Sequence, residues 1–435
     1  MTYQEAIKYL CSLQMFGMRL GLDSTEWLAG QFGNPHENLR FIHVAGTNGK
    51  GSVCAMLESI YRAAGWRTGL FTSPHLVSFT ERIQINRQPV AEADVVRWVE
   101  AIRGKVDGTG QSLTFFEVVT VMALLCFKEQ GCDIVMWETG LGGRLDATNI
   151  VTPVASVITN IELDHEQWLG TTHEQIATEK AGIIKPGVPV ITAAEPGRGL
   201  EVIIETAQRR GCPLAVVDGK LTPGQTESPP TLTHALLGAH QMVNAAVARA
   251  VVDVLSAHWA APEKAVQTGL RTVSWPGRMQ LIQRDVNHRI LLDGAHNPAS
   301  GLALREAFQE SFVGVRPTLI LGMLADKNWT SMVEILAPLA SRIITVPVSS
   351  PRTLDASQLA ASCRAARPEI PVEHRATLRA ALAECGTDDF LLITGSLYLV
   401  GEAMDELRAL PAKHPTERAL NDWNGARVCD PQRVR

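Results

Sequence analysis

Long apolar runs are missing from this sequence. The longest, residues 118–127, is much shorter than the roughly 20 residues that a membrane-spanning helix requires. The first ten residues include an acid and contain no apolar run like that of a secretory signal. We therefore expect a cytoplasmic protein without a membrane partner.

Cysteine is sparse, and its spacing forms no metal or redox motif. Eight cysteines are spread over 435 residues, and none belongs to a C-x-x-C pair. Most lie in apolar stretches, so we expect buried free thiols in a reducing compartment. The sequence has no G-x-S-x-G motif and no convincing cysteine nucleophile. We therefore expect chemistry that needs no nucleophile on the protein.

An excess of positive charge is also absent. Lysine and arginine number 40 against 45 aspartates and glutamates, for a formal net charge of −5. This balance argues against a nucleic-acid partner or an anionic membrane surface, although a local phosphate site remains compatible with it. At 435 residues the chain exceeds the roughly 250–300 at which one core stops growing, which predicts two domains.

Short β-branched runs alternate with longer helical patterns in the first half of the chain. This alternation predicts βαβ units in a mostly parallel sheet that is covered by helices. The predicted strands are 41–45, 68–71, 133–138, 154–160, 189–193 and 214–217, and the predicted helices include 52–64, 91–103, 115–129 and 200–210.

A second alternating series follows the Trp-Pro-Gly turn at 275–277, with predicted strands at 290–292, 318–321, 342–346 and 390–394. We predict an α/β fold with a P-loop-type, mostly parallel N-terminal domain over 1–275. A smaller Rossmann-like α/β domain is expected over 276–412. Residues 221–233 are predicted to form a surface loop, and 413–435 a polar, mobile tail.

A glycine-rich loop, GTNGKGS, lies between a predicted strand and a predicted helix. Glycines let backbone N–H groups turn toward an anion, and the helix N-terminus adds the positive end of its dipole. The general pattern G-x-x-x-x-G-K-[ST] fails at Val44 and Gly51, so an ordinary glycine-rich turn is the alternative. The predicted nucleotide contacts are Gly46, Thr47, Asn48, Gly49, Lys50, Gly51 and Ser52.

Two further polar residues follow successive predicted strands. Glu138 ends one strand, and His165 comes shortly after the next. Alone, Glu138 could cap a turn and His165 could be a satisfied structural histidine. Ligands of doubly wound sheets gather at the carboxyl ends of strands, so together they favour a divalent cation beside the phosphate loop.

Nine blocks then follow one another in the order of a known family. The chain resembles the Mur ligase superfamily and, within it, the folylpolyglutamate synthase/dihydrofolate synthase family. The blocks are GTNGKGS, TSPHL, ETGLGGRLDATN, LDH, EKAGI, GAHQ, WPGR, DGAHNP and TGSLYLVGE. The resemblance implies an ATP-dependent ligase that adds L-glutamate to folates, and also to dihydropteroate, through an acyl phosphate. It further implies two Mg²⁺ sites, ATP as co-substrate and a monomer.

Three other functions remain open. A related Mur-type ligase would act on a different carboxylate, against which the TSPHL, LGGRLDATN and TGSLYLVGE blocks argue. A nucleotide-binding regulatory module would have lost catalysis, which the retained lysines and metal residues disfavour. A phosphotransferase would form ADP without any need for glutamate.

The resemblance also implies roles around the metal. Ser73, Glu138 and His165 match magnesium ligands, and Lys180 matches a lysine that is carbamylated in many members. Carbamylation turns this cation into a carboxylate-like anion that helps to bind the second magnesium. From the residues alone, Lys180 would be a solvated helix lysine. The expected catalytic residues are Lys50, Lys180 and His165.

Further matches concern the nucleotide and the amino acid. Asn244 is implied near the adenine, Arg278 as an ATP contact, and Asp293 as a ribose or phosphate partner. His296 lies where the amino-acid substrate is expected. By spacing alone, Asp293 and His296 could instead cap the helix that starts near Pro298.

Three positions bear on the acceptor. Phe116 would offer an aromatic face to a pterin, and Asp146 a carboxylate to its N–H edge. Phe116 could equally be a core residue, because it opens an apolar helix. Arg82 is a candidate partner for a glutamate carboxylate of the substrate. The chain departs from the family's usual residues at Arg87, Gln280 and Asn328, which leaves the substrate preference open.

Overall fold

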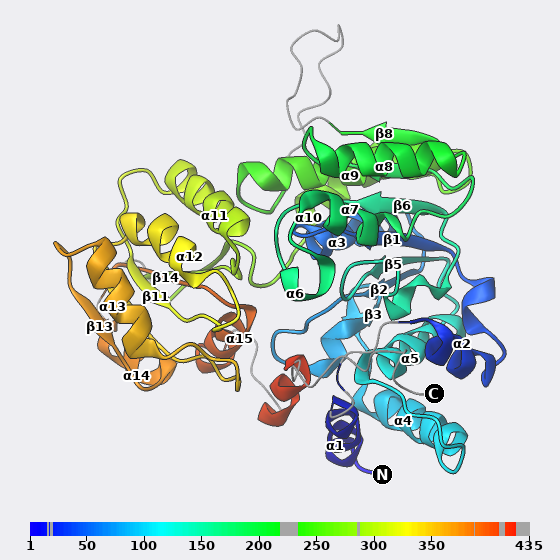
Figure 1. The fold of residues 1–435 in the computed structure, drawn as a ribbon, viewed down its shortest axis with the longest axis horizontal. Coiled ribbons are helices and arrows are strands. Elements are labelled where there is room, and N and C mark those ends of the chain that lie inside the picture. The colour runs from blue at the N-terminus through cyan, green and yellow to red at the C-terminus, as the bar shows by residue number, and fades with distance from the viewer. Residues whose placement is uncertain are drawn as a thin grey trace, which may run out of the picture.

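The computed structural model shows two α/β lobes, each built around its own sheet, which confirms the predicted fold class (Figure 1). It describes residues 1–14, 17, 21–217, 234–284, 288–386, 388–408 and 414–422. The loop predicted at 221–233 lies outside these residues. Within the described ranges, no helix combines the length and the apolarity needed to cross a membrane.

The first sheet has eight strands in the order β4-β3-β2-β5-β1-β6-β7-β8. Its strands run parallel from β2 to β8 in this order, whereas β3 and β4 form an antiparallel edge. The sequence analysis missed β3 and β4, whose two or three residues include polar side chains and form no apolar run. The strands are β1 (Phe41–Ala45), β2 (Thr68–Phe71), β3 (Ile83–Ile85), β4 (Gln88–Pro89), β5 (Ile134–Glu138), β6 (Ala155–Ile158), β7 (Val190–Thr192) and β8 (Leu214–Val216).

Helices cover both faces of this sheet, which explains its uniformly apolar central strands. Val135 and Trp137 of β5 pack in one cluster with α1, α4 and α5, whereas Ile134 and Met136 pack on the opposite face with α3, α9 and α10. The helices are α1 (Tyr3–Leu13), α2 (Asp23–Gly30), α3 (Lys50–Ala63), α4 (Glu92–Val106), α5 (Phe115–Glu129), α6 (Glu166–Leu169), α7 (His173–Ala181), α8 (Arg198–Arg209), α9 (Ala239–Leu255) and α10 (Glu263–Thr272), with 3₁₀ turns η2 (Pro35–Asn38), η3 (Phe79–Arg82) and η4 (Ala147–Ile150).

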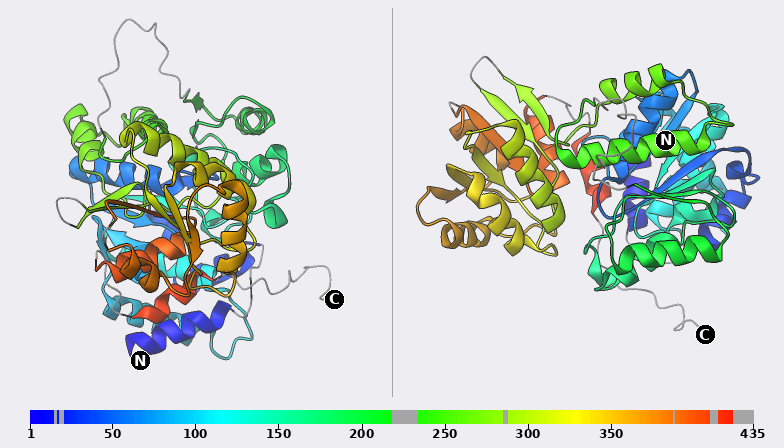
Figure 2. Two further views of the ribbon diagram at one scale, coloured as in Figure 1. Left: turned by 90° about the vertical axis from the view of Figure 1, so that its left-hand side faces the viewer. Right: turned by 90° about the horizontal axis from the view of Figure 1, so that it is seen from above.

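The second sheet has six strands in the order β13-β12-β11-β14-β10-β9, and only β9 is antiparallel to its neighbour. Its core helices α11, α12 and α13 pack in one cluster, and α14 and α15 in another. Figure 2 shows the two lobes side by side. The elements are β9 (Gln280–Gln283), β10 (Arg289–Leu292), α11 (Pro298–Ser311), β11 (Thr318–Leu321), α12 (Trp329–Leu336), η5 (Ala337–Leu339), β12 (Arg342–Thr345), α13 (Ala356–Ala366), β13 (Val372–His374), α14 (Leu378–Glu384), β14 (Phe390–Thr394) and α15 (Leu397–Glu406).

The chain then returns from the second lobe to the first. The predicted polar tail from 413 includes residues 414–422, in which the structure has the 3₁₀ turn η6 (Pro415–Asn421). This segment, red in Figure 1, lies between the lobes beside α1. Glu417 and Leu420 are each only 1% exposed. The sequence shows no apolar periodicity in this segment that would predict its burial. The segment is held instead by contacts of individual side chains with distant elements.

Candidate active site between the lobes

A cavity of about 770 Å³ lies between the two lobes. The first lobe contributes the phosphate loop and the carboxyl ends of β1, β2, β5 and β6, and the second contributes the loop after β10 and the start of α15. Every site residue predicted from the sequence lines this cavity: residues 46–52, Ser73, Arg82, Phe116, Glu138, Asp146, His165, Lys180, Asn244, Arg278, Asp293 and His296.

The phosphate loop leaves β1 at Ala45 and enters α3 at Lys50. Gly49 adopts a φ of 84°, and a Cβ on it would lie 2.6 Å from Asn244 Oδ1. A Cβ on Gly46 would overlap the hydroxyl of Thr159. Both positions therefore require glycine. The first N–H groups of α3 have no acceptor within the helix and are available to an anion.

Lys50 is folded back onto this loop. Its Nζ donates to the carbonyl oxygens of Gly46 at 2.9 Å and Thr47 at 3.2 Å. The loop is also tied to the end of β6, because Asn160 accepts hydrogen bonds from the backbone N–H groups of Thr47 and Asn48. These contacts hold the ammonium of Lys50 against the phosphate loop.

Glu138 is a buried carboxylate with few groups near it that stabilise its negative charge. It is 4% exposed, and the backbone N–H of Ser73 donates to its Oε2 at 3.1 Å. Burial raises the pKa of Glu138 to about 7, against the lowering effect of Lys50. No cationic side chain in the described part of the chain forms an ion pair with it. Such a group fits a bound cation, since carboxylate oxygen is a preferred magnesium ligand.

His165 follows β6 and has a left-handed backbone, with a φ of 52°. Burial, and then the charge of Lys327, lower its pKa to about 3, so the ring is neutral and able to ligate a metal. No group of three or more His, Cys, Asp or Glu side chains among the described residues is arranged as a metal site. A metal here would therefore need ligands of other kinds.

Lys180 is buried, so the alternative of a solvated helix lysine is wrong. Its side chain donates from Nζ to the carbonyl of Gly46 at 2.8 Å, and the residue is 3% exposed. Burial, together with the nearby charge of Lys50, holds the pKa of Lys180 well below its usual value. The neutral amine is thereby favoured beside the phosphate loop.

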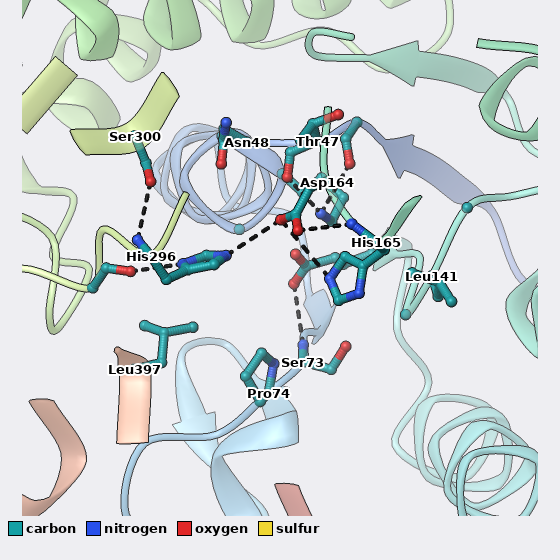
Figure 3. A pocket seen from close by; sticks show the side chains of 18 of the residues that line it. Thr47, Asn48, Ser73, Pro74, Leu141, Asp164, His165, His296, Ser300 and Leu397 are labelled. Atoms are coloured by element: carbon teal, nitrogen blue, oxygen red, sulfur yellow. Dashed lines mark hydrogen bonds and ion pairs between the residues drawn. The ribbon is translucent and has the colours of Figure 1, made fainter. Parts of the chain in front are cut away.

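Asp164 joins the two lobes, a role that the sequence analysis missed. Lys327 Nζ donates to its Oδ1 at 2.6 Å, and Asn297 Nδ2 donates to its Oδ2 at 3.0 Å. His296 Nε2 lies 3.6 Å from Oδ2, and Figure 3 shows Asp164 between His296 and Thr47. Burial alone would raise the pKa of Asp164, but the contact with His296 and the neighbouring positive charges hold it well below its usual range. The LDH and DGAHNP blocks contain Asp164 and Asn297, but nothing in them indicated that these residues meet.

Asp293 and His296 do not cap α11. Asn297 caps that helix, with its Oδ1 accepting the N–H of Ser300 at 2.9 Å. The carboxylate of Asp293 instead accepts the backbone N–H groups of Met279 and Ala295, each at 2.9 Å. His296 is left to point its ring toward the first lobe (Figure 3).

The expected pterin contacts lie at one wall of the cavity. Phe116 is partly buried, and its ring occupies the space in which a side chain at Gly140 would lie. Asp146 already accepts the N–H groups of Leu141 at 2.8 Å and Thr148 at 3.0 Å. The hydroxyl of Thr148 also donates to Oδ1 of Asp146, so this carboxylate has a structural role that the sequence did not reveal.

Comparisons with known proteins agree with this arrangement. The chain matches the Mur ligase middle domain over residues 44–212 and the Mur ligase, glutamate ligase domain over 277–397. Dihydrofolate synthase/folylpolyglutamate synthase of Bacillus subtilis is 33% identical over 434 residues, covering 94% of this chain and 99% of that protein. Folylpolyglutamate synthase from Thermotoga maritima has a TM-score of 0.82 at 32% identity, covering 96% of this chain and 98% of that one.

A second solved structure is a bifunctional folylpolyglutamate synthase/dihydrofolate synthase with Mn, AMPPNP and L-glutamate bound. It has a TM-score of 0.80 at 31% identity, over 93% of this chain and 98% of that one. These matches span both lobes and the cavity between them. The chain therefore belongs to the folylpolyglutamate synthase/dihydrofolate synthase family of Mur ligases.

Proposed function

We propose that the protein is an ATP-dependent ligase that adds L-glutamate to folates and to dihydropteroate through an acyl phosphate. The observation that carries this proposal is a single cavity, which combines a glycine-rich phosphate loop with a buried, unpaired carboxylate and a facing second lobe. Amide formation from a carboxylate needs phosphoryl activation and then capture by an amine, and the two lobes can hold one reactant each. The activities named for the similar proteins support the same assignment.

ATP binds with its phosphates at the start of α3, where unpaired helix N–H groups meet Lys50. Lys50 exchanges the carbonyls of Gly46 and Thr47 for phosphate oxygens. Asn244, which packs beside Gly49, completes the nucleotide site together with Arg278 and Asp293. AMPPNP in a similar structure supports ATP as the nucleotide.

Magnesium fits the donor set beside the loop. Glu138, Ser73 and His165 are its proposed ligands, and Lys180 joins them at a second site when carbamylated. Burial favours the neutral amine of Lys180, which is the form that reacts with carbon dioxide. When bound, the ions neutralise the crowded phosphate oxygens. Mn in a similar structure supports a divalent metal.

The acceptor lies along Phe116, with its pterin edge toward Asp146 and a glutamate carboxylate toward Arg82. An oxygen of its reacting carboxylate attacks the γ-phosphorus, and ADP leaves. L-Glutamate, held near His296, then attacks the acyl carbon through its amine, and phosphate leaves as the amide forms. The contacts of Asp164 hold the second lobe over this reaction and exclude water. We also propose a cytoplasmic location, which the seven free cysteines of the described residues support.

The test supplies ATP, L-glutamate and either dihydropteroate or tetrahydrofolate and measures ADP release. We expect ADP that depends on both the acceptor and glutamate, and a severe loss in Lys50→Ala. Lys105→Ala, on the exposed face of α4, is the matched control and should be as active as the wild type. No acceptor-dependent ADP with either acceptor would refute the proposal, and ADP without glutamate would indicate a phosphotransferase.

A further inference from the structure

We propose that the segment 414–422 is part of the acceptor site, and that Asn421 positions Arg82 there for a carboxylate of the acceptor. The inference rests on the proposed function and goes beyond it, because it assigns a site role to residues that follow both lobes. Leu420, Asn421 and Asp422 line the cavity together with Arg82 and Phe116, and Asn421 contacts Arg82.

The segment is anchored to both lobes. In the first lobe, Glu417 is 1% exposed and accepts hydrogen bonds from Ser78 Oγ at 2.9 Å and from the backbone N–H of Phe79. In the second lobe, the hydroxyl of Tyr398 donates to the carbonyl of Asn421. Ser350 Oγ donates to Asp422 Oδ1 at 2.6 Å. These hydrogen bonds to both lobes therefore fix the position of the segment between them.

Two groups of this segment orient Arg82. Asn421 Oδ1 accepts from the guanidinium at 2.6 Å, and Asn421 Nδ2 donates to the carbonyl of His75 at 2.8 Å. His75 Nδ1 accepts from Arg82 Nε at 2.9 Å, which requires the proton to be on Nε2. That Nε2–H donates to the backbone carbonyl of Glu417 at 3.0 Å. The segment thus acts on Arg82 directly and through His75.

These partners orient the charge of Arg82 without cancelling it. Both acceptors, the amide of Asn421 and the ring of His75, are neutral groups. The nearest acid in sequence, Glu81, accepts the backbone N–H groups of Leu76, Val77 and Ser78. No carboxylate among the described residues forms an ion pair with Arg82. Arg82 is 3% exposed and lines the cavity, so its charge remains available to an anion there.

The reactant that binds beside Arg82 and Asn421 is the acceptor and not the incoming L-glutamate. Arg82 lies over the ring of Phe115, with its Cζ 5.3 Å from the ring centroid, beside the proposed pterin position at Phe116. The proposed glutamate position at His296 lies on the other lobe. A reduced folate carries a glutamate carboxylate that does not react, whereas dihydropteroate has only the reacting one. Arg82 should therefore matter more for tetrahydrofolate than for dihydropteroate.

Asn421→Asp is the most informative variant, because it keeps a hydrogen-bond acceptor on Arg82 but neutralises its charge. Hydrogen bonds to a charged group are strong enough that we expect the KM for tetrahydrofolate to rise about tenfold to a hundredfold. The KM for dihydropteroate should rise less, and the KM for ATP should stay within about twofold. Asn421→Ala should raise the KM for tetrahydrofolate by a smaller factor. Asn38→Asp, an exposed asparagine of η2, is the matched control.

Asn421→Asp also loses the donor to the carbonyl of His75. A purely structural role for Asn421 therefore predicts that Asn421→Asp raises the KM for tetrahydrofolate and the KM for dihydropteroate by the same factor, which would overturn the inference. A rise in the KM for L-glutamate instead of tetrahydrofolate would also overturn it. If Asn421→Asp folds poorly, Glu417→Gln provides the second test, and we expect the same selective rise in the KM for tetrahydrofolate. Wild-type protein without acceptor-dependent ADP release would refute the proposed function itself, so the two failures are distinguishable.

Discussion

Asp164 and Lys327 form a buried ion pair between the lobes, and Asp164→Asn removes one of its charges. The side chains are 8% and 10% exposed, with 2.6 Å between Oδ1 and Nζ. Asparagine keeps the shape of the residue and can still accept from Asn297. The ammonium of Lys327 would, however, remain buried without its anionic partner.

The size of the effect follows from this geometry. Two unit charges 2.6 Å apart attract by about 6 kcal/mol at an effective dielectric constant of about 20. Desolvation cancels much of this attraction, and removal of one partner of such a pair across an interface costs about 2–5 kcal/mol. Because asparagine preserves one neutral hydrogen bond, we expect about 2 kcal/mol. That corresponds to a decrease in kcat/KM of about 30-fold.

The assay is a double-mutant cycle on kcat/KM for acceptor-dependent ADP release, with Asp164→Asn, Lys327→Gln and the double variant. The double variant should be much less impaired than the product of the two single effects, since each substitution removes the same interaction. Glu406→Gln breaks the exposed ion pair with Arg379 and serves as the control, with an expected change within twofold. Single effects that add within about 0.5 kcal/mol would refute the coupling.

The pH dependence of this coupling has a defined sign. The folded-state pKa of Asp164 is depressed, so its contribution is present above the unfolded value of about 3.9 and is lost only as the pH falls through the lower folded value. The coupling energy should therefore be the same at pH 5 and pH 8.

Two further predictions concern the first lobe. Gly46→Ala should abolish ATP binding in a calorimetric titration, because its methyl group would overlap the hydroxyl of Thr159; Gly65→Ala, with positive φ but open space around it, should retain binding. Glu138→Gln should stabilise the metal-free protein at pH 8 by up to about 3 kcal/mol, because a rise in pKa from 4.5 to about 7 destabilises the wild type as the pH increases through that interval. The difference in the free energy of unfolding should vanish near pH 4 when it is measured by chemical unfolding. Added Mg²⁺ should raise the Tm of the wild type but not of the variant. A difference that does not depend on pH would contradict the raised pKa of Glu138.

Much of the first lobe could be predicted because its signals are local. The strand, glycine loop and helix around Lys50 are consecutive in the chain, and their dihedral and capping requirements are visible in the residue types. The same holds for Glu138, which a buried apolar strand places at its own end. Strands β3, β4, β9 and β13 were missed because their few residues mix polar with apolar side chains, and their pairing is decided by neighbours.

The sequence by itself determined the α/β class, the phosphate loop and many of the residues that line the cavity. Only the tertiary structure decided which side chains meet there: Asp164 with Lys327, 163 positions apart, and Arg82 with Asn421, 339 positions apart. It also showed that Asp146 and Asp293 hold backbone N–H groups and that Lys180 is buried. Backbone preference and hydrophobic period act over a few residues, whereas the partner of a polar side chain depends on how whole elements pack.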